Sequence, residues 1–151
     1  MPKQDKDISI YDFYQHDDQL WIGTSEGIFI QYKDGSFQLK KIQYKGEALI
    51  ASSFFKDIDG TFYVGTQYSL FVYNIEKNTV AMLPNTEKDS VMSKIISSRV
   101  VSVVRDTIEQ HPALLTSPYG HYITYYDLIE KKMGIAYQLR KTFFCKIQFQ
   151  G

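Results

Sequence analysis

A repeat with a period of 42 residues constrains the fold of this 151-residue chain more than any other feature of its sequence. The run Trp21-Ile22-Gly23-Thr24 recurs as Tyr63-Val64-Gly65-Thr66, each time before a short turn and an apolar segment. The offset continues without a gap to Phe13 and Phe55. Such a period is typical of solenoids and propellers, in which each repeat is one supersecondary unit. We therefore expect structural roles for the six repeat positions Trp21, Gly23, Thr24, Tyr63, Gly65 and Thr66.

Each of these two units contains four short segments rich in aromatic and β-branched residues, which favour strands. We expect strands at 8–15, 19–24, 27–32 and 36–42 in the first unit, and at 49–56, 61–66, 69–74 and 78–83 in the second. The pairs Asp34-Gly35 and Asp59-Gly60 separate two of these strand pairs. Because both residue types tolerate positive φ, each pair predicts a two-residue hairpin turn.

A third, degenerate unit follows, and its spacing from the second stretches to roughly 50 residues. Leu114-Leu115-Thr116 stands where the earlier units have Ile-Gly-Thr or Val-Gly-Thr. We expect strands at 99–105, 112–117, 121–126 and 131–137, although Pro112 and Pro118 weaken the second of them because proline cannot donate to a ladder. The predicted organisation is a polar tail at 1–7, repeat units at 8–42, 49–83 and 99–137, and the first strand of a further unit at 142–149.

A repeated four-stranded meander of 40–50 residues is typical of a β-propeller blade. The aromatic content of 15% supports an all-β chain. We therefore predict three antiparallel four-stranded blades plus the first strand of a fourth, which is an incomplete propeller. A β-sandwich or a closed barrel is the alternative, but neither requires a repeated four-strand unit.

Charge and composition exclude several classes of protein. Seventeen Lys and Arg balance seventeen Asp and Glu, which argues against a nucleic-acid partner and against electrostatic contact with a membrane. No apolar run approaches the length of a membrane span, and residues 1–7 lack the apolar core of a signal peptide. Cys145 is the only cysteine, so no internal disulfide forms.

Candidate ligand contacts lie where the blade-to-blade connectors meet the turns between second and third strands. A meander places these loops at one end of the sheets, near 24–27, 43–48, 66–69, 84–98, 116–121 and 134–141. Recognition residues concentrate on loops that a rigid scaffold positions. We predict ligand contacts at Tyr68, Tyr119 and His121. For Trp21 and Tyr63 we favour packing between blades over the alternative of a platform on which sugars stack.

The remaining chemistry-bearing residues indicate neither catalysis nor metal binding. Asp17-Asp18 and the Asp57/Asp59 pair lack the ligand series of a calcium loop and are expected in turns. His16 is expected to be solvated in a turn, and neither it, His111 nor His121 has the spacing of metal ligands. We expect a buried, inert thiol at Cys145. No catalytic constellation stands out, so we expect no enzyme activity, no cofactor and no metal.

Residues 20–28 (LWIGTSEGI) and 57–66 (DIDGTFYVGT) resemble the two-component regulator propeller repeat. The third unit departs from that pattern, since it has neither Trp nor Gly-Thr. The resemblance implies the periplasmic sensor propeller of a hybrid two-component histidine kinase of gut Bacteroidetes, whose usual inputs are oligosaccharides. It implies that the partners of this segment are the remaining blades of a longer protein.

Three interpretations follow for a chain of three blades, since a ring needs about four to eight blades to close. The chain is a piece of a longer sensor, a separate protein whose arc closes by pairing with another copy, or the product of a broken gene. A sensor segment would be periplasmic, and a separate protein without a signal peptide would be cytoplasmic. The alternative functions are a protein-interaction scaffold and, less favoured, a propeller lyase or hydrolase.

Overall fold

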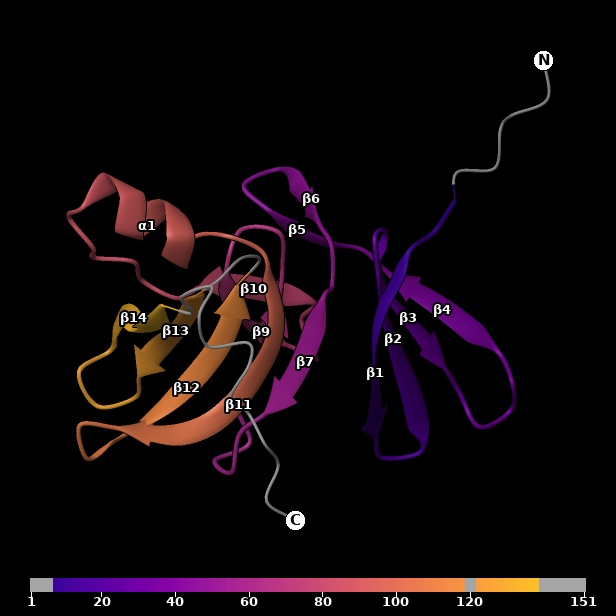
Figure 1. The fold of residues 1–151 in the computed structure, drawn as a ribbon. Helices are drawn as coiled ribbons and strands as arrows, with labels where there is room; N and C mark the ends of the chain where they lie inside the picture. The colour runs from indigo at the N-terminus through magenta and orange to yellow at the C-terminus, as the bar shows by residue number, and fades with distance from the viewer. Residues whose placement is uncertain (1–6, 119–121, 139–151) are drawn as a thin grey trace, which may run out of the picture.

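The computed structural model describes residues 7–118 and 122–138, and the predicted strand at 142–149 lies outside them. The described chain forms three antiparallel four-stranded sheets, each a meander in which sequential strands pair (Figure 1). This confirms the prediction of an all-β chain built from propeller-type blades.

The three sheets are named blades 1 to 3 in chain order. Blade 1 contains β1 (Ile10–His16), β2 (Gln19–Thr24), β3 (Gly27–Gln31) and β4 (Phe37–Lys40). Blade 2 contains β7 (Ser53–Lys56), β8 (Phe62–Gly65), β9 (Leu70–Asn74) and β10 (Thr79–Met82). Blade 3 contains β11 (Val100–Ile108), β12 (His111–Pro118), β13 (Tyr122–Asp127) and β14 (Lys132–Gln138). The first strands β1, β7 and β11 lie beside one another, so the blades stack as an arc.

Two elements lie in connectors for which we predicted loops. The connector of blades 1 and 2 forms a hairpin of β5 (Ile42–Tyr44) and β6 (Glu47–Leu49). Lys45 and Gly46 close it with positive φ angles of 51° and 82°, which suit a two-residue turn. The connector of blades 2 and 3 contains the helix α1 (Ser90–Ile96), whose N-cap Asp89 accepts bonds from the Val91 and Met92 amides.

The prediction of two-residue turns at Asp34-Gly35 and Asp59-Gly60 is wrong, because both loops contain three residues. The Asp57 amide donates to the Thr61 carbonyl at 2.9 Å, which leaves residues 58–60 in the loop. The Tyr32 amide donates to Ser36 in the same way, at 2.9 Å. In each loop the glycine occupies the third position with φ above +80°, the arrangement of a three-residue hairpin with an αL residue.

This turn length corrects the repeat alignment in the first strands. Tyr14 pairs with Trp21 in blade 1, and Phe55 pairs with Tyr63 in blade 2. Phe55 is therefore the counterpart of Tyr14, not of Phe13. The loop at 58–60 is one residue longer than the turn at 17–18, and a one-residue shift moves every side chain to the opposite face of a strand.

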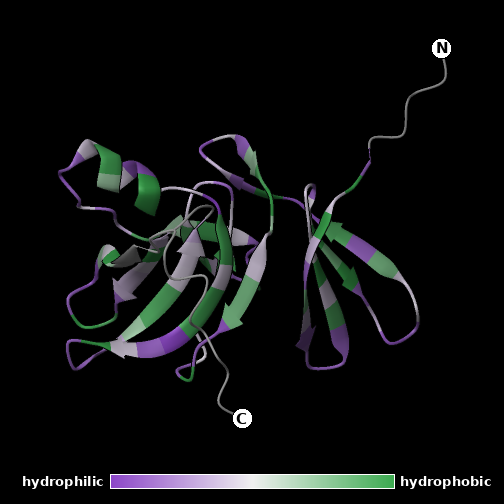
Figure 2. Cartoon of the chain, viewed as in Figure 1, coloured by the Kyte–Doolittle hydropathy of each residue, from purple (hydrophilic) through white to green (hydrophobic). Residues whose placement is uncertain are grey.

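Rows of paired residues across each sheet build the two hydrophobic cores, and apolar residues alternate along the strands (Figure 2). The row Tyr14–Trp21–Ile30 of blade 1 faces the row Phe54–Val64–Phe71–Met82 of blade 2. The row Phe55–Tyr63–Val72 of blade 2 faces Leu114, Tyr126 and Met133 of blade 3.

Trp21 is fully buried in the first core, and its ring centroid lies 5.3 Å from that of Phe62 and 6.2 Å from that of Phe54. Tyr63 is 4% exposed at the equivalent place in the second core. Such burial leaves neither ring a free face on which a sugar could stack.

His16 is not solvated, in contrast to the expectation from sequence. It is the last residue of β1, its side chain is 17% exposed, and its ring centroid lies 5.0 Å from that of Trp21. Because it belongs to the edge of the first core, it is better described as a packing residue.

Gly23 and Gly65 permit the close approach of successive blades. A Cβ at Gly23 would lie 2.4 Å from the carbonyl oxygen of Ala51, in the segment that leads into blade 2, and one at Gly65 would lie 3.1 Å from the Val100 side chain of blade 3. Thr24 and Thr66 are also buried, and each hydroxyl donates to the backbone carbonyl of a residue three positions on. The Gly-Thr pair therefore serves blade contact and the following turn.

Candidate functional site

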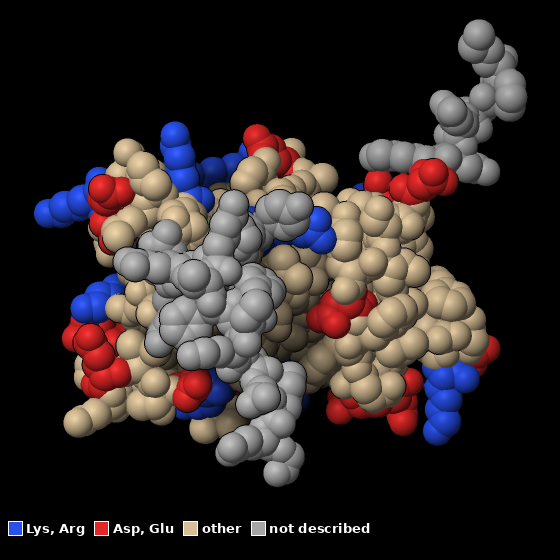
Figure 3. All heavy atoms as spheres, viewed as in Figure 1, with Lys and Arg blue, Asp and Glu red and all other residues tan. Residues whose placement is uncertain are grey.

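The two ends of the arc carry different loops and turns. The end that carries the β5–β6 hairpin, the β8–β9 turn and α1 is the connector end, at the top of Figure 1. The end that carries the β1–β2, β7–β8 and β13–β14 turns is the hairpin end. On the face shown in Figure 3, charged side chains of both signs lie along the upper and lower margins and on the left-hand side, and one acidic group lies near the centre. Among the described residues no helix has the length and apolarity needed to cross a membrane.

A cleft at the connector end contains Tyr68, one of the three predicted ligand contacts. We call it the Tyr68 cleft; its volume is about 260 Å³ and its lining residues are Tyr44, Lys45, Glu47, Tyr68, Met82 and Ser97. These residues come from the β5–β6 hairpin, the β8–β9 turn, the end of β10 and the C-cap of α1. Tyr119 and His121, the other two predicted contacts, lie outside the described residues.

Hydrogen bonds hold the hairpin of one connector against the turn of the next blade. The Tyr68 hydroxyl donates to Glu47 Oε2 at 2.6 Å, and this bond to a carboxylate raises the pKa of Tyr68. Beside it, Gln67 Nε2 donates to the Ala48 carbonyl at 2.9 Å, and Gln67 Oε1 accepts the Ile50 amide at 2.9 Å. The cleft is therefore preorganised at the junction of blades 1 and 2.

The chemistry of the Tyr68 cleft combines aromatic surface with a few polar groups. Tyr68 is 39% exposed, and the Lys45 ammonium lies 5.2 Å from the centroid of the Tyr44 ring. A carboxylate, an ammonium and two phenols beside apolar walls suit a small polyhydroxylated ligand. The sequence pointed to Tyr68 through its loop position. Tyr44 and Glu47 lie in the predicted loop at 43–48 of the same end, but they were not singled out because the sequence did not show that this loop folds as a hairpin against Tyr68.

A second cleft, at the hairpin end between blades 2 and 3, has a volume of about 430 Å³. Tyr63, Tyr126, Asp57 and Arg105 all contribute to its lining. Burial and the nearby Asp57 carboxylate raise the pKa of Tyr63 to about 12, so this phenol stays protonated. Arg105 Nη1 forms an ion pair with the buried Asp57 carboxylate across the blade junction. The Asp57 carboxylate and the Arg105 guanidinium therefore neutralise each other in this cleft.

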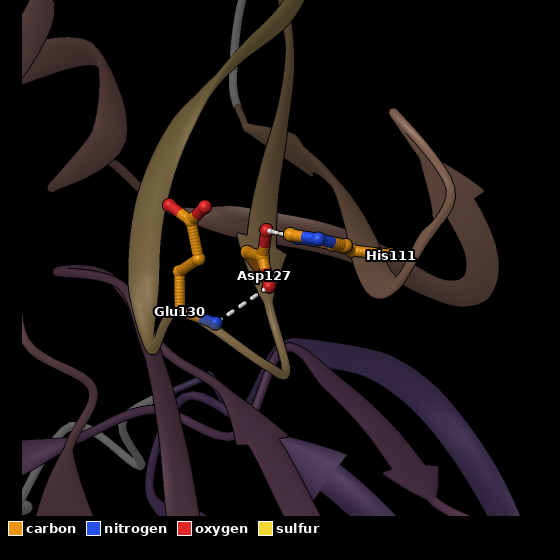
Figure 4. Close-up of side chains that lie close together, drawn as sticks. All are labelled: His111, Asp127 and Glu130. Carbon is orange, nitrogen blue, oxygen red and sulfur yellow. Dashed lines mark hydrogen bonds and ion pairs between the residues drawn. The ribbon is translucent and has the colours of Figure 1, made fainter.

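His111, Asp127 and Glu130 form a further polar group at the hairpin end of blade 3 (Figure 4). Their donor atoms lie within 4.8 Å of one another, a spacing that a metal ion could bridge. The structure accounts for them without one. His111 Nδ1 donates to Asp127 Oδ2 at 2.7 Å, Asp127 Oδ1 accepts the Ile129 and Glu130 amides at 2.8 Å, and Glu130 pairs with Lys132. The group fastens the β13–β14 turn to the start of β12.

The pKa shifts of this pair define a pH window. The hydrogen bond to Asp127 raises the pKa of His111. Burial by itself would raise the pKa of Asp127, but the Glu130 amide and His111 outweigh it, so the Asp127 pKa is lowered. The His111 contribution to stability is complete below about pH 6.5 and lost as pH rises; the Asp127 contribution is complete above about pH 4 and lost as pH falls. The pair stabilises most between these limits.

We expect His111→Gln to lower the thermal midpoint more at about pH 5.5 than at about pH 8.5, because the charged pair persists only at the lower pH. Thermal unfolding of both proteins in matched buffers measures this difference. In an Asp127→Asn background the pH dependence of the His111→Gln effect should vanish. Equal losses at both pH values would contradict the assigned coupling.

No protein-family profile and no curated protein sequence matches this chain. Two solved structures of the extracellular domain of BT4673 from B. thetaiotaomicron are similar to it, each with a TM-score of 0.59 and 18% sequence identity. With one of these structures BT4673 is called a one component system, and with the other it is called a hybrid two component system. Each match covers 91% of this chain but 18% of the neighbour, so the chain spans under a fifth of the structures it matches. At this identity the likeness establishes a shared fold.

Proposed function

We propose that this chain is a ligand-binding propeller segment of an extracytoplasmic sensor in two-component signalling. The observation that carries the proposal is the fold match over 91% of the chain to the extracellular domain of BT4673. The resemblance of segments 20–28 and 57–66 to the regulator propeller repeat supports it independently. In this proposal the chain belongs to that repeat family and acts in the periplasm.

The proposed ligand is a neutral oligosaccharide, and the proposed site is the Tyr68 cleft. Exposed aromatic surface at Tyr68 and Tyr44 would pack against the apolar faces of sugar rings, while Glu47 would accept hydrogen bonds from sugar hydroxyls. The chain would perform no chemistry of its own. Binding would instead bias the arrangement of blades, and so a histidine kinase elsewhere in the system, by no more than the ligand's differential affinity for two states.

Calorimetric titration of the purified chain with a panel of neutral oligosaccharides tests this proposal. We expect one member to bind, and we expect Tyr68→Ala to weaken its binding about tenfold through loss of the ring and its hydroxyl. Phe37→Ala is the matched control, since Phe37 is an exposed aromatic residue outside the cleft. Equal effects of the two substitutions would place the ligand elsewhere, and no binding across the panel would remove the oligosaccharide hypothesis.

The second candidate is a protein-interaction scaffold. The observation that favours it is the apolar face of blade 1 opposite the Trp21 row, on which Ile10, Phe13 and Phe37 are each more than half exposed. Patches of this kind mark interaction surfaces. Purification of the chain with a specific protein partner, together with no response to oligosaccharides, would favour the scaffold over the sensor.

A further inference from the structure

The cleft between blades 2 and 3 lies where smaller side chains replace those that fill the equivalent junction of blades 1 and 2. At that first junction Trp21 packs against Phe62, with their ring centroids 5.3 Å apart. The corresponding residues at the second junction are Tyr63 and Leu114. A volume of about 430 Å³ remains there, and its described lining comes from blades 2 and 3 alone. The cleft therefore lies inside the arc, between two blades that are both present.

Two buried tyrosines of this cleft have hydroxyl groups without a protein partner. Tyr63 is 4% exposed, Tyr126 is 5% exposed, and both line the cleft. Among the described residues neither hydroxyl forms a hydrogen bond, and neither oxygen is sealed from solvent. Tyr73, the counterpart of Tyr126 in blade 2, instead donates to Asn78 Oδ1 at 2.7 Å. Because buried phenols normally find a partner, these two hydroxyls are left for water or a ligand in the cleft.

Opposite charges from the two blades line the same cleft without meeting. Asp59, in the β7–β8 loop, and Lys131, in the β13–β14 turn, are both exposed and form no ion pair with each other. The Asp59 carboxylate accepts the Thr61 amide of its own loop at 2.8 Å, and the Lys131 ammonium has no partner in the described part of the chain. Since Asp57 and Arg105 neutralise each other, Asp59 and Lys131 carry the charges that a ligand would meet first.

The rest of the lining is apolar. Val72, Leu83 and Leu128 belong to the second hydrophobic core and also border the cleft. A ligand that fits this lining needs an apolar body, a group that binds a carboxylate and a group that binds an ammonium. A purely cationic ligand would face Lys131 and a purely anionic one would face Asp59, so single charges are disfavoured.

We propose that the cleft between blades 2 and 3 binds a free α-amino acid with an apolar side chain. Its ammonium would bind Asp59 and its carboxylate would bind Lys131. The hydroxyls of Tyr63 and Tyr126 would each complete a hydrogen bond to one of these two charged groups. A cleft of this volume is large enough for such a ligand. The inference does not rest on the proposed oligosaccharide site, which lies at the other end of the arc.

Calorimetric titration of the full chain with L-leucine and with L-phenylalanine tests the proposal. We expect at least one to bind with a dissociation constant of about 0.1 mM. The matching amine, which lacks the carboxylate, and the matching acid, which lacks the ammonium, should bind about tenfold more weakly or worse. No binding of either amino acid up to about 10 mM would overturn the proposal, and so would equal binding of a single-charge analogue.

Tyr126→Phe removes only a hydroxyl that makes no contact in the fold, and it should weaken amino-acid binding about tenfold. Tyr32→Phe is the matched control, because the Tyr32 hydroxyl donates to Gln38 in blade 1, outside the cleft. It should leave binding unchanged. Equal effects of the two substitutions would contradict the assigned site, and the thermal midpoint of each variant establishes that it is folded.

Lys131→Met separates the two charges of the ligand. It should remove the preference for the amino acid over the matching amine, since only the amino acid carries a carboxylate. A preference that survives this substitution would contradict the assigned orientation. Tyr68→Ala, which tests the proposed oligosaccharide site, should not change amino-acid binding, so the two proposals can fail separately. Loss of amino-acid binding in Tyr68→Ala would place the amino acid in the Tyr68 cleft and overturn the inference.

Discussion

Replacing Trp21 with alanine should lower the free energy of unfolding by about 3–5 kcal/mol. The side chain has no solvent-exposed surface and packs against Phe54, Phe62 and Tyr73 of blade 2, so its removal leaves a cavity between two sheets. The indole Nε1 donates to Gln19 Oε1 at 3.0 Å, and that bond is lost as well. Urea denaturation followed by circular dichroism measures the change.

Ile58→Ala is the control for this substitution, because Ile58 is 85% exposed in the β7–β8 loop and should change stability by less than about 0.5 kcal/mol. Trp21→Phe should give an intermediate loss, since it keeps an aromatic ring in the core. A loss below about 1 kcal/mol for Trp21→Ala would contradict the assignment of the indole to packing between blades 1 and 2.

The repeat predicted the fold because the residues that recur at the same spacing are the ones buried between blades. Alternation along each strand and the recurrence of Trp21-Ile22-Gly23-Thr24 as Tyr63-Val64-Gly65-Thr66 reflect two faces that each meet another blade. Both contacts recur with the same geometry, so the same residue types return at the same spacing. The buried residues on both sides of blade 2 follow from this.

The register of the first strands could not be read from the same repeat. It depends on whether the loop after β7 contains two or three residues, and Asp59-Gly60 is compatible with both. The Gly60 amide donates to the Asp57 carbonyl, which closes the longer loop and moves Phe55, rather than Lys56, onto the face of Tyr63. Local residue preferences set the turn, but the turn sets which side chains reach the core.

The candidate site was predictable only in part, for a related reason. A connector joins two blades and takes part in no repeat, so periodicity carries no information about it. Tyr68 lies in a turn that belongs to the repeat and was found. Glu47, its hydrogen-bond partner, lies on the hairpin of a connector and was missed. The signal that could have found the hairpin is Lys45-Gly46, a pair that tolerates two successive positive φ angles.

Arg105 of blade 3 and Asp57 at the end of β7 form an ion pair between blades 2 and 3. Arg105→Met should lower the free energy of unfolding by about 3–5 kcal/mol, because the Asp57 side chain is 2% exposed and would become a buried charge without its partner. Apart from Arg105, the Asp57 carboxylate is held by the Ile58 amide at 2.8 Å, a bond within its own turn. Equilibrium unfolding in urea at neutral pH gives the value.

The double variant Asp57→Asn/Arg105→Met tests whether the loss of stability comes from leaving the Asp57 carboxylate unpaired or from losing the stabilisation that the ion pair itself provides. If the loss in Arg105→Met comes from the stranded carboxylate, removing that charge as well should recover most of the stability. Lys132→Met, which breaks the exposed pair with Glu130, is the matched control and should have little effect. A double variant no more stable than Arg105→Met would contradict this account. The aliphatic part of the Arg105 side chain, which pairs across β11 and β12 with Leu114, would then be what stabilises the junction.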